Sequence, residues 1–310
     1  MRIGIFFGAR REVVGFNTLV ERASHAERDG LSHFWVPHLP TLGYDALTAL
    51  AIIARQTSRI ELGTAVVPVF AAHPLTLAQH AMTAQAASGG RLILGIGLSH
   101  QPVVEGMLGL SYARPARYME EYLAVLRPLF SAGRVDFTGQ IFSVKAELRV
   151  QDSSPFPVLL AALAPRMLRL AGAMADGTVT WMAGRKTIAS HIVPRLHAAA
   201  QAAGRPQPRV CVGLPIAVTD DEAQGREYAA KDFQRYGQLV NYRRLLDIEG
   251  VEGPADVAVV GNEHQVEQQL RAFAAAGATD FLAAIFPVGE NPDASIARTW
   301  SLLKNLNGTL

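Results

Sequence analysis

The sequence alternates short apolar runs with longer helical segments, and this alternation most constrains the fold that the chain can adopt. The clearest unit spans residues 60–100, where the run Ile60–Pro68, the helical segment 74–88 and the run 90–97 follow one another. Apolar, β-branched runs of this length are typical of strands that are buried on both faces. The second run ends in a glycine-rich tip, Gly95–His100, which leaves the backbone open to a flat ring. Residues 60–100 therefore predict a β-α-β unit whose strand ends carry functional loops.

The same alternation continues on both sides of this unit and predicts eight strands. Eight strands alternating with helices over 310 residues favour an α/β fold of the (β/α)8 TIM barrel type, which commonly needs about 250 residues or more. A doubly wound sheet is the open alternative, because periodicity does not decide whether the sheet closes. The expected strands are 2–7, 33–36, 60–66, 92–97, 157–162, 178–182, 209–218 and 280–286. The expected helices are 16–29, 45–56, 74–88, 115–130, 164–174, 187–203, 221–236, 263–276 and 293–306.

Two segments interrupt the alternation. Residues 135–144 predict a short hairpin that turns at Thr138–Gly139. Residues 237–262 contain an irregular stretch, 246–256, so we expect an insertion loop there, either a lid over a site or a plain solvated loop. No repeat, low-complexity tract or linker divides the sequence, and we therefore expect a single domain over residues 1–310.

Composition and charge argue against several classes of function. The formal net charge is +2 and no cluster of Lys and Arg stands out, so nucleic acid is not an expected partner. The single cysteine, Cys211, excludes an intrachain disulfide and a cysteine-based metal cluster. Residues 1–7 lack the features of a signal peptide, and no run approaches the ~20 apolar residues of a membrane span. We expect a cytoplasmic protein that does not bind membranes.

Several motifs, taken in their order and spacing, resemble one known family. They are Gly95–His100, the segments Tyr112–Tyr122 and Ala161–Gly177, and Val260–Glu263 followed by a helix and Ala276–Asp280. Together they resemble the luciferase-like monooxygenase superfamily of (β/α)8 barrels that use flavins or deazaflavins. Within it, the chain most resembles the actinobacterial branch that depends on the deazaflavin coenzyme F420. The resemblance implies an oxidoreductase that transfers a hydride between the deazaflavin and a small organic substrate.

The resemblance also implies which residues hold the cofactor. In the F420 branch a non-prolyl cis peptide lies behind the deazaflavin ring, and the matching pair here is Ala65–Val66, for which an ordinary trans strand end is the alternative. Gly97, Leu98 and Ser99 match the edge of the ring. The cofactor phosphate is expected on the loop after the fifth strand and on the following helix start. That loop consists of Ala161, Ala162, Leu163, Ala164 and Pro165, and Trp181 after the next strand is either a wall of this site or a core aromatic.

Two histidines follow strands at positions where the family places reacting groups. His38 matches a histidine beside the reactive ring carbon in the sugar-phosphate dehydrogenase members, and His100 matches a position where those members carry an acidic side chain. An imidazole can serve as acid or base near neutral pH, because its ordinary pKa is about 6.5. His38 could instead only shape the pocket or bind the cofactor, and His100 could only contact the ring or the cofactor tail. Hydride transfer needs no metal ion, and none is expected.

One departure from the family pattern concerns the cofactor. Pro37 stands where many deazaflavin-dependent relatives carry an Asp that contacts the ring. FMN is therefore the alternative cofactor, and it would imply a monooxygenase that uses oxygen and a separate flavin reductase. A barrel that binds the cofactor without turnover is a third possibility. Phe70, Met107 and Trp181 are expected to line the pocket, with the insertion 237–262 as a possible further contributor, and their apolar character favours a non-sugar substrate. Members of the superfamily often form homodimers, which we expect here as well.

Overall fold

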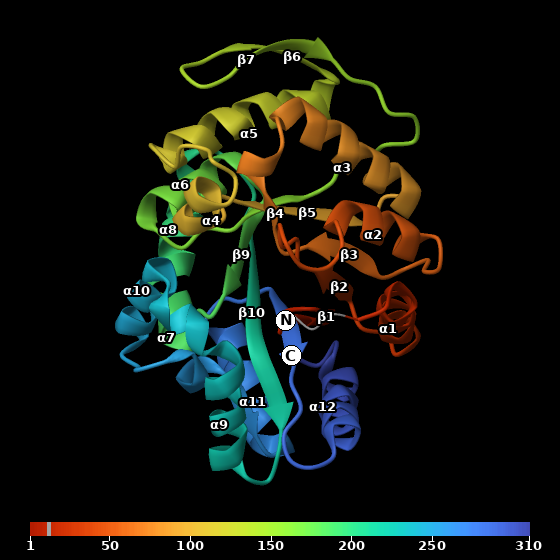
Figure 1. Cartoon of the computed structure of the whole chain (residues 1–310), viewed down its shortest axis with the longest axis vertical. Coiled ribbons are helices and arrows are strands. Elements are labelled where there is room, and N and C mark those ends of the chain that lie inside the picture. The colour runs from red at the N-terminus through yellow and green to blue at the C-terminus, as the bar shows by residue number, and fades with distance from the viewer. Residues whose placement is uncertain (11–13) are drawn as a thin grey trace.

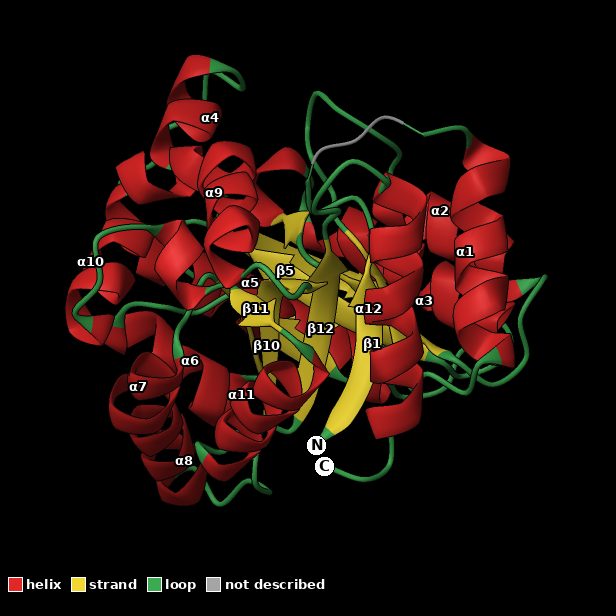
Figure 2. Cartoon of the chain, turned by 90° about the horizontal axis from the view of Figure 1, so that it is seen from below, coloured by secondary structure: helices red, strands yellow, loops and turns green. Residues whose placement is uncertain are grey.

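A closed barrel of eight parallel strands forms the centre of the chain, and helices surround it (Figures 1 and 2). The computed structural model describes residues 1–10 and 14–310. The pairings of β9 (Gly177–Trp181) with β10 (Arg209–Val218) and of β12 (Asp280–Ile285) with β1 (Arg2–Phe6) close the sheet, and this closure excludes a doubly wound sheet. All eight predicted strands are confirmed to within two residues at each end or better, except that the third strand is split by a bulge. The barrel strands are β1 (Arg2–Phe6), β2 (His33–Val36), β3 (Glu61–Thr64), β5 (Leu92–Gly97), β8 (Val158–Leu160), β9 (Gly177–Trp181), β10 (Arg209–Val218) and β12 (Asp280–Ile285).

The strands are apolar throughout because each of them is covered on both faces. One set of side chains fills the barrel interior, with Trp35 and Leu159 fully buried there, and the other set packs against the helices. Every residue of β2 and β5 is buried. The apolar area removed from water in this two-sided core is the main stabilising contribution.

The predicted helices cover the outside of the barrel. Helix α3 illustrates how the sequence sets the ends: Pro74 is its first residue, the His73 ring accepts a hydrogen bond from the Leu75 N–H, and Gly89 ends it with a φ of 61°. The predicted helix 187–203 is interrupted, because α7 (Arg185–Thr187) continues through a π-helical turn (Ile188–Ile192) into α8 (Val193–Ala202). The other large helices are α1 (Phe16–Arg28), α2 (Ala46–Ala54), α3 (Pro74–Ser88), α5 (Pro115–Ala132), α6 (Pro165–Met174), α9 (Glu222–Phe233), α11 (Glu263–Ala275) and α12 (Pro292–Leu306).

The predicted hairpin is confirmed as an antiparallel pair of β6 (Arg134–Thr138) and β7 (Ser143–Glu147), which lies outside α5 (Figure 1). Its turn spans residues 139–142 and not Thr138–Gly139 as predicted, because Thr138 pairs with Ser143. The buried Glu121 carboxylate of α5 fixes its turn by accepting hydrogen bonds from the N–H groups of residues 140–142. The expectation of an irregular stretch at 246–256 is wrong for its first part, because helix α10 (Val240–Glu249) runs through it and ends at Gly250, whose φ is 85°. The remaining short elements are β4 (Val67–Pro68), η1 (Val69–Ala71), α4 (Gln101–Gly106), η3 (Gln234–Gln238), η4 (Pro254–Val257) and β11 (Val259–Gly261).

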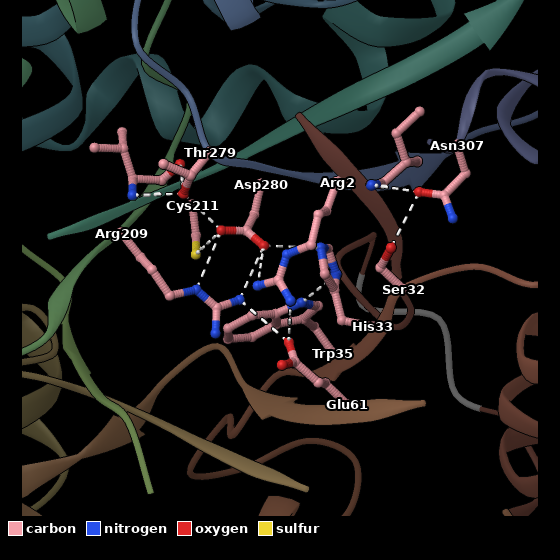
Figure 3. A network of polar contacts seen from close by, with 12 residues as sticks. Arg2, Ser32, His33, Trp35, Glu61, Arg209, Cys211, Thr279, Asp280 and Asn307 are labelled. Carbon is pink, nitrogen blue, oxygen red and sulfur yellow. Dashed lines mark hydrogen bonds and ion pairs between the residues drawn. The ribbon is translucent and has the colours of Figure 1, made fainter. Parts of the chain in front are cut away.

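An ionic layer fills the barrel where the strands begin (Figure 3). Buried Asp280 accepts hydrogen bonds from Arg209 and forms an ion pair with Arg2, and both arginines also contact Glu61. His33 is fully buried beside them, and burial lowers its pKa to about 3 against the opposing effect of the Asp280 charge. Burial by itself would raise the pKa of Asp280, but the facing His33 and the two guanidinium groups outweigh it and hold that pKa well below its usual range. This ionic layer closes the barrel at the end opposite the carboxyl ends of the strands.

Within the described residues, no helix is both long enough and apolar enough to span a lipid bilayer.

Candidate active site

A cavity of about 450 Å³ opens at the carboxyl ends of the barrel strands, where TIM barrels carry their active sites. The loops after the strands supply its walls, together with η3 and α10. Most of the residues predicted from the sequence meet there. The predicted residues that line the cavity are His38, Ala65, Val66, Ser99, His100, Ala161, Leu163 and Trp181. The predicted residues that do not line it are Gly97, Leu98, Ala162, Ala164 and Pro165.

The floor of the cavity is a bulge between β3 and β5 that contains a cis peptide bond at Ala65–Val66. The predicted cis bond is therefore present in the structure. The register shows the bulge directly, because Gly63 pairs with Ile93 and Val67 pairs with Ile96, which leaves one extra residue on the β3–β4 side. The bulge turns the Ala65–Val66 backbone toward the cavity.

Two glycines of β5 make room for this bulge. A Cβ atom on Gly95 would lie 2.0 Å from the carbonyl oxygen of Thr64, and a Cβ on Gly97 would lie 2.7 Å from a methyl group of Val66. The Thr64 hydroxyl locks the contact by donating to the Gly95 carbonyl (2.8 Å) and accepting from the Gly95 N–H (2.9 Å). Gly97 is therefore a support of the floor rather than part of the cavity lining.

His38 follows β2 and enters the cavity beside Pro37. Its Nδ1 lies 3.2 Å from a carboxylate oxygen of Asp45, the N-cap residue of α2, but has no hydrogen-bond partner among the described residues. Burial lowers the pKa of His38, and the Asp45 charge opposes that effect only in part. The imidazole is therefore neutral at pH 7, with its Nδ1 beside Asp45 and its side chain in the wall of the cavity.

His100 lies at the other side of the cavity, at the start of α4. Its backbone carbonyl accepts hydrogen bonds from the N–H groups of Val103 and Val104, while its ring takes no part in capping the helix. The ring packs near Tyr242 of α10, with 5.8 Å between ring centroids. Burial lowers the pKa of His100, and the nearby positive charge of Arg235 lowers it further. The preceding Ser99 has a φ of 61°, a left-handed conformation that is uncommon for a residue with a side chain.

An aromatic wall completes the cavity. Trp181 contacts Phe6 edge-on at 5.3 Å and Tyr236 at 5.7 Å, and its buried indole N–H has no hydrogen-bond partner in the part of the chain that the structure describes. Trp181 is thus both a wall residue and an unpaired donor. Phe70, which was expected to line the cavity, stacks instead on Tyr118 at 4.1 Å inside the core, so that expectation is wrong. Met107 lines the cavity as expected.

The sequence predicts residues 237–262 as an insertion loop that contributes to the pocket or lies in solvent, and the first part of this segment does line the cavity, although as a helix. Arg235 and Tyr236, at the end of the predicted helix 221–236, line the cavity without having been predicted to do so. The cluster of aromatic side chains with one arginine between two helices was the signal that could have identified this wall. The residues of η3 and α10 and of the turn between them that line the cavity are Arg235, Tyr236, Gln238, Leu239 and Tyr242.

The loop expected to bind phosphate connects β8 to α6. Ala161 and Leu163 face the cavity, Ala162 is fully buried, and exposed Pro165 is the first residue of α6, as predicted. The first turn of a helix has N–H groups without partners in the helix, which suits an anion. Nearby Arg166 is exposed, and its Nη2 lies 3.7 Å from a carboxylate oxygen of Glu120.

These features fit a flat heteroaromatic cofactor. Ala65 and Val66 of the bulge line the cavity, the two glycines of β5 let the bulge lie close to that strand, and Trp181 presents a buried indole N–H without a partner among the described residues. Buried polar groups are nearly always paired, so this N–H is suited to a bound ligand. Fold and site together define a TIM barrel with a cavity at the carboxyl ends of its strands that is suited to an organic ligand.

The comparisons with known proteins identify the family. Residues 1–299 match the luciferase-like monooxygenase family, and the chain belongs to it. It is 28% identical to the F420-dependent glucose-6-phosphate dehydrogenase of Nakamurella multipartita over 276 residues. The aligned region covers 84% of this chain and 80% of that protein.

Two solved structures show the same fold. An F420-dependent secondary alcohol dehydrogenase superposes with a TM-score of 0.79 at 20% identity, covering 97% of each chain. The oxygenating constituent of 3,6-diketocamphane monooxygenase from Pseudomonas putida, in complex with FMN, gives a TM-score of 0.76 at 16% identity, covering 99% of this chain and 97% of the other.

Proposed function

We propose that this chain is an F420-dependent oxidoreductase that transfers a hydride between the deazaflavin and a small organic substrate. The observation that carries the proposal is the bulge between β3 and β4, where Ala65 and Val66 line a cavity that His38 and His100 also line. The similarity to relatives that are named F420-dependent supports this cofactor over FMN. Pro37 replaces an expected acidic contact with the ring, and in this proposal the neighbouring His38, whose side chain lines the cavity, makes that contact in its place.

The residues of the chain have separate tasks in this proposal. Ala65 and Val66 support one face of the ring, while Ser99 and Trp181 lie at its edges. Gly97 and Leu98 hold the β5 end that carries Ser99. The loop Ala161, Ala162, Leu163, Ala164 and Pro165 receives the phosphate of the cofactor tail.

Bound F420 supplies the carbon that accepts or releases the hydride. When the substrate is an alcohol, a neutral imidazole accepts the hydroxyl proton while the carbon of the alcohol gives up its hydride. Both candidate imidazoles are in the required form at pH 7, because burial lowers the pKa of His38 and of His100. In the reverse direction the same group returns the proton.

The cofactor is tested by titrating the purified protein with F420 and with FMN while following the fluorescence of each cofactor. We expect F420 to bind more tightly by about tenfold or more, which corresponds to about 1.4 kcal/mol. Tighter binding of FMN would favour an FMN-dependent monooxygenase that uses oxygen and a separate flavin reductase. Binding of F420 with no turnover of any alcohol, carbonyl, C=C or C=N substrate would favour a non-catalytic cofactor-binding barrel. No binding of either cofactor would overturn the proposal.

The histidines are tested by His38→Gln and His100→Gln, assayed with an alcohol that supports F420 reduction. The variant that lacks the proton acceptor should lose about 10²–10⁴-fold in kcat. In the wild type, alcohol oxidation should decline only below about pH 6.5, because the base must be neutral and its pKa is lowered. In the variant that lacks the proton acceptor, the remaining activity should no longer decline at acidic pH, while the Kd of F420 should change little. Unchanged kcat in both variants would remove both residues from the proton transfer.

The homodimer and the cytoplasmic location stay predictions.

A further inference from the structure

The cavity has an uneven distribution of charge. Among the lining residues of the part of the chain that the structure describes, Arg235 is the one side chain with a full charge, since both histidines are neutral at pH 7. No Asp or Glu of these described residues lines the cavity. The remaining lining is mostly apolar and aromatic. A ligand that fills this cavity therefore meets one localised positive charge on an otherwise neutral surface.

Arg235 is oriented but has no counter-ion among residues 1–10 and 14–310. Its Nη2 donates a hydrogen bond to the Tyr236 hydroxyl at 2.7 Å, and its guanidinium lies 4.6 Å from the centroid of that ring. Two other arginines near this wall are paired: Arg10 with Asp232 at 2.9 Å, and Arg243 with Asp247 at 2.8 Å. Arg244 of α10 has no ion-pair partner among the described residues either, but it is exposed and lies outside the cavity, whereas Arg235 lines it.

The arrangement of donors suits a carboxylate. A guanidinium presents five N–H donors in a planar fork that matches the two oxygens of a carboxylate, and most of these donors are unused in Arg235. The Tyr236 hydroxyl accepts from Arg235, so its own hydrogen is free to donate to the same ligand. A neutral amide of equal shape would receive weaker hydrogen bonds and no charge attraction.

The position of Arg235 places such a carboxylate near the reacting groups. Its charge is close enough to lower the pKa of His100. Tyr242 connects the two places, with its ring 5.8 Å from His100 and 5.2 Å from Tyr236. The loop expected to hold the cofactor phosphate belongs to a different wall, at Ala161–Pro165.

We propose that Arg235 and Tyr236 bind a carboxylate group of the substrate, so that the enzyme acts on a small organic acid with an apolar body. This inference rests on the proposed function only in placing the substrate in this cavity. The side chain of F420 also carries carboxylates, and titration with and without F420 separates the two sources.

The test is isothermal titration calorimetry of the full chain with benzoate and with benzamide, which have the same shape and differ in charge. Each is titrated into the protein alone and into the protein saturated with F420. We expect benzoate to bind at least about tenfold more tightly than benzamide, as a charge-assisted hydrogen bond implies. Arg235→Gln should reduce this preference to about twofold or less, Arg235→Lys should keep part of it, and Tyr236→Phe should weaken it.

Arg244→Gln is the matched control, because Arg244 is an exposed residue of α10 outside the cavity and its substitution removes the same charge. It should keep the wild-type preference. Equal binding of the two probes, or a preference that survives Arg235→Gln, would overturn the inference. The inference would also be overturned if Arg235→Gln weakened F420 binding but left the ratio of the benzoate and benzamide affinities unchanged, because Arg235 would then bind the cofactor. Failure of F420 to bind, with the benzoate preference intact in the protein alone, would count against the proposed cofactor and support the carboxylate site.

Discussion

Replacing Gly95 with alanine is expected to disrupt the floor of the cavity and to weaken cofactor binding severely. The new Cβ would lie 2.0 Å from the Thr64 carbonyl oxygen, a backbone atom that cannot turn aside as a side chain could. Relief requires β5 and the bulge at Ala65–Val66 to separate, which breaks both hydrogen bonds of the Thr64 hydroxyl. Overpacking of this kind typically costs about 1–3 kcal/mol, and a backbone clash falls at the upper end. Urea denaturation and F420 titration of the same variant measure the two effects.

Gly106→Ala is the matched control for this prediction. A Cβ atom added to Gly106, the last residue of α4, would have open space around it, with no neighbouring atom within 4 Å. Alanine also favours helices over glycine by about 1 kcal/mol. The control should leave cofactor affinity unchanged and should not destabilise the chain. A Gly95→Ala variant with wild-type stability and cofactor affinity would show that the bulge does not depend on close approach of the two strands.

Replacing Asp280 with alanine is expected to produce the largest loss of stability. The variant leaves the guanidinium groups of Arg2 and Arg209 in the barrel with only the partly exposed Glu61 as a counter-ion among the described residues (Figure 3). The Arg209 side chain is only 19% exposed, and removing one partner of such a largely buried ion pair typically costs about 3–5 kcal/mol, because the other charge stays buried. Arg2, whose side chain is 43% exposed, adds little to this loss. Urea denaturation at pH 7 measures the loss as a change in the free energy of unfolding.

The exposed Asp220, which pairs with Arg298, is the control, and Asp220→Ala should have a much smaller effect. The pH dependence gives a second readout. The pKa of Asp280 is lowered on folding, so its contribution is present above the unfolded pKa of about 3.9 and is lost as the pH falls further. His33 affects stability from a higher pH. Its pKa is about 3 in the folded chain but about 6.5 in the unfolded chain, so the unfolded chain takes up a proton first as the pH falls. The free energy of unfolding therefore declines from about pH 6.5 downward. An Asp280→Ala chain as stable as the wild type would refute the structural role of the ionic layer.

The fold was largely predictable because its strands carry a strong signal. Runs such as Leu92–Gly97 are apolar on both faces, and only a sheet covered on both sides explains eight of them. Closure of the barrel was not predictable from these runs, because it depends on pairing between β9 and β10 and between β12 and β1. Helix α10 escaped notice because Gly250, Gly253 and Pro254 follow it closely and gave the whole segment an irregular character.

The candidate site was predicted where it depends on the β-strand ends and missed where it depends on tertiary packing. His38, His100 and the Ala65–Val66 pair follow strands directly, so their place at one edge of the barrel follows from topology. Arg235 lies on a helical segment outside the barrel, and its approach to the cavity depends on how η3 and α10 pack. Gly97 shows a different limit: its position was predicted, but its role as a spacer beneath Val66 needed atomic distances.

The ionic layer where the barrel strands begin also determines how reactant and product reach and leave the cavity. Salt bridges and Trp35 fill the end of the barrel where the strands begin, so small molecules cannot pass through the barrel. Reactant and product must both enter and leave the cavity at the carboxyl ends of the strands. Slow release of the product would therefore delay binding of the next reactant. Met107 is exposed and lines the cavity, so substitutions there should change the association and dissociation rate constants without altering contacts to the reacting atoms.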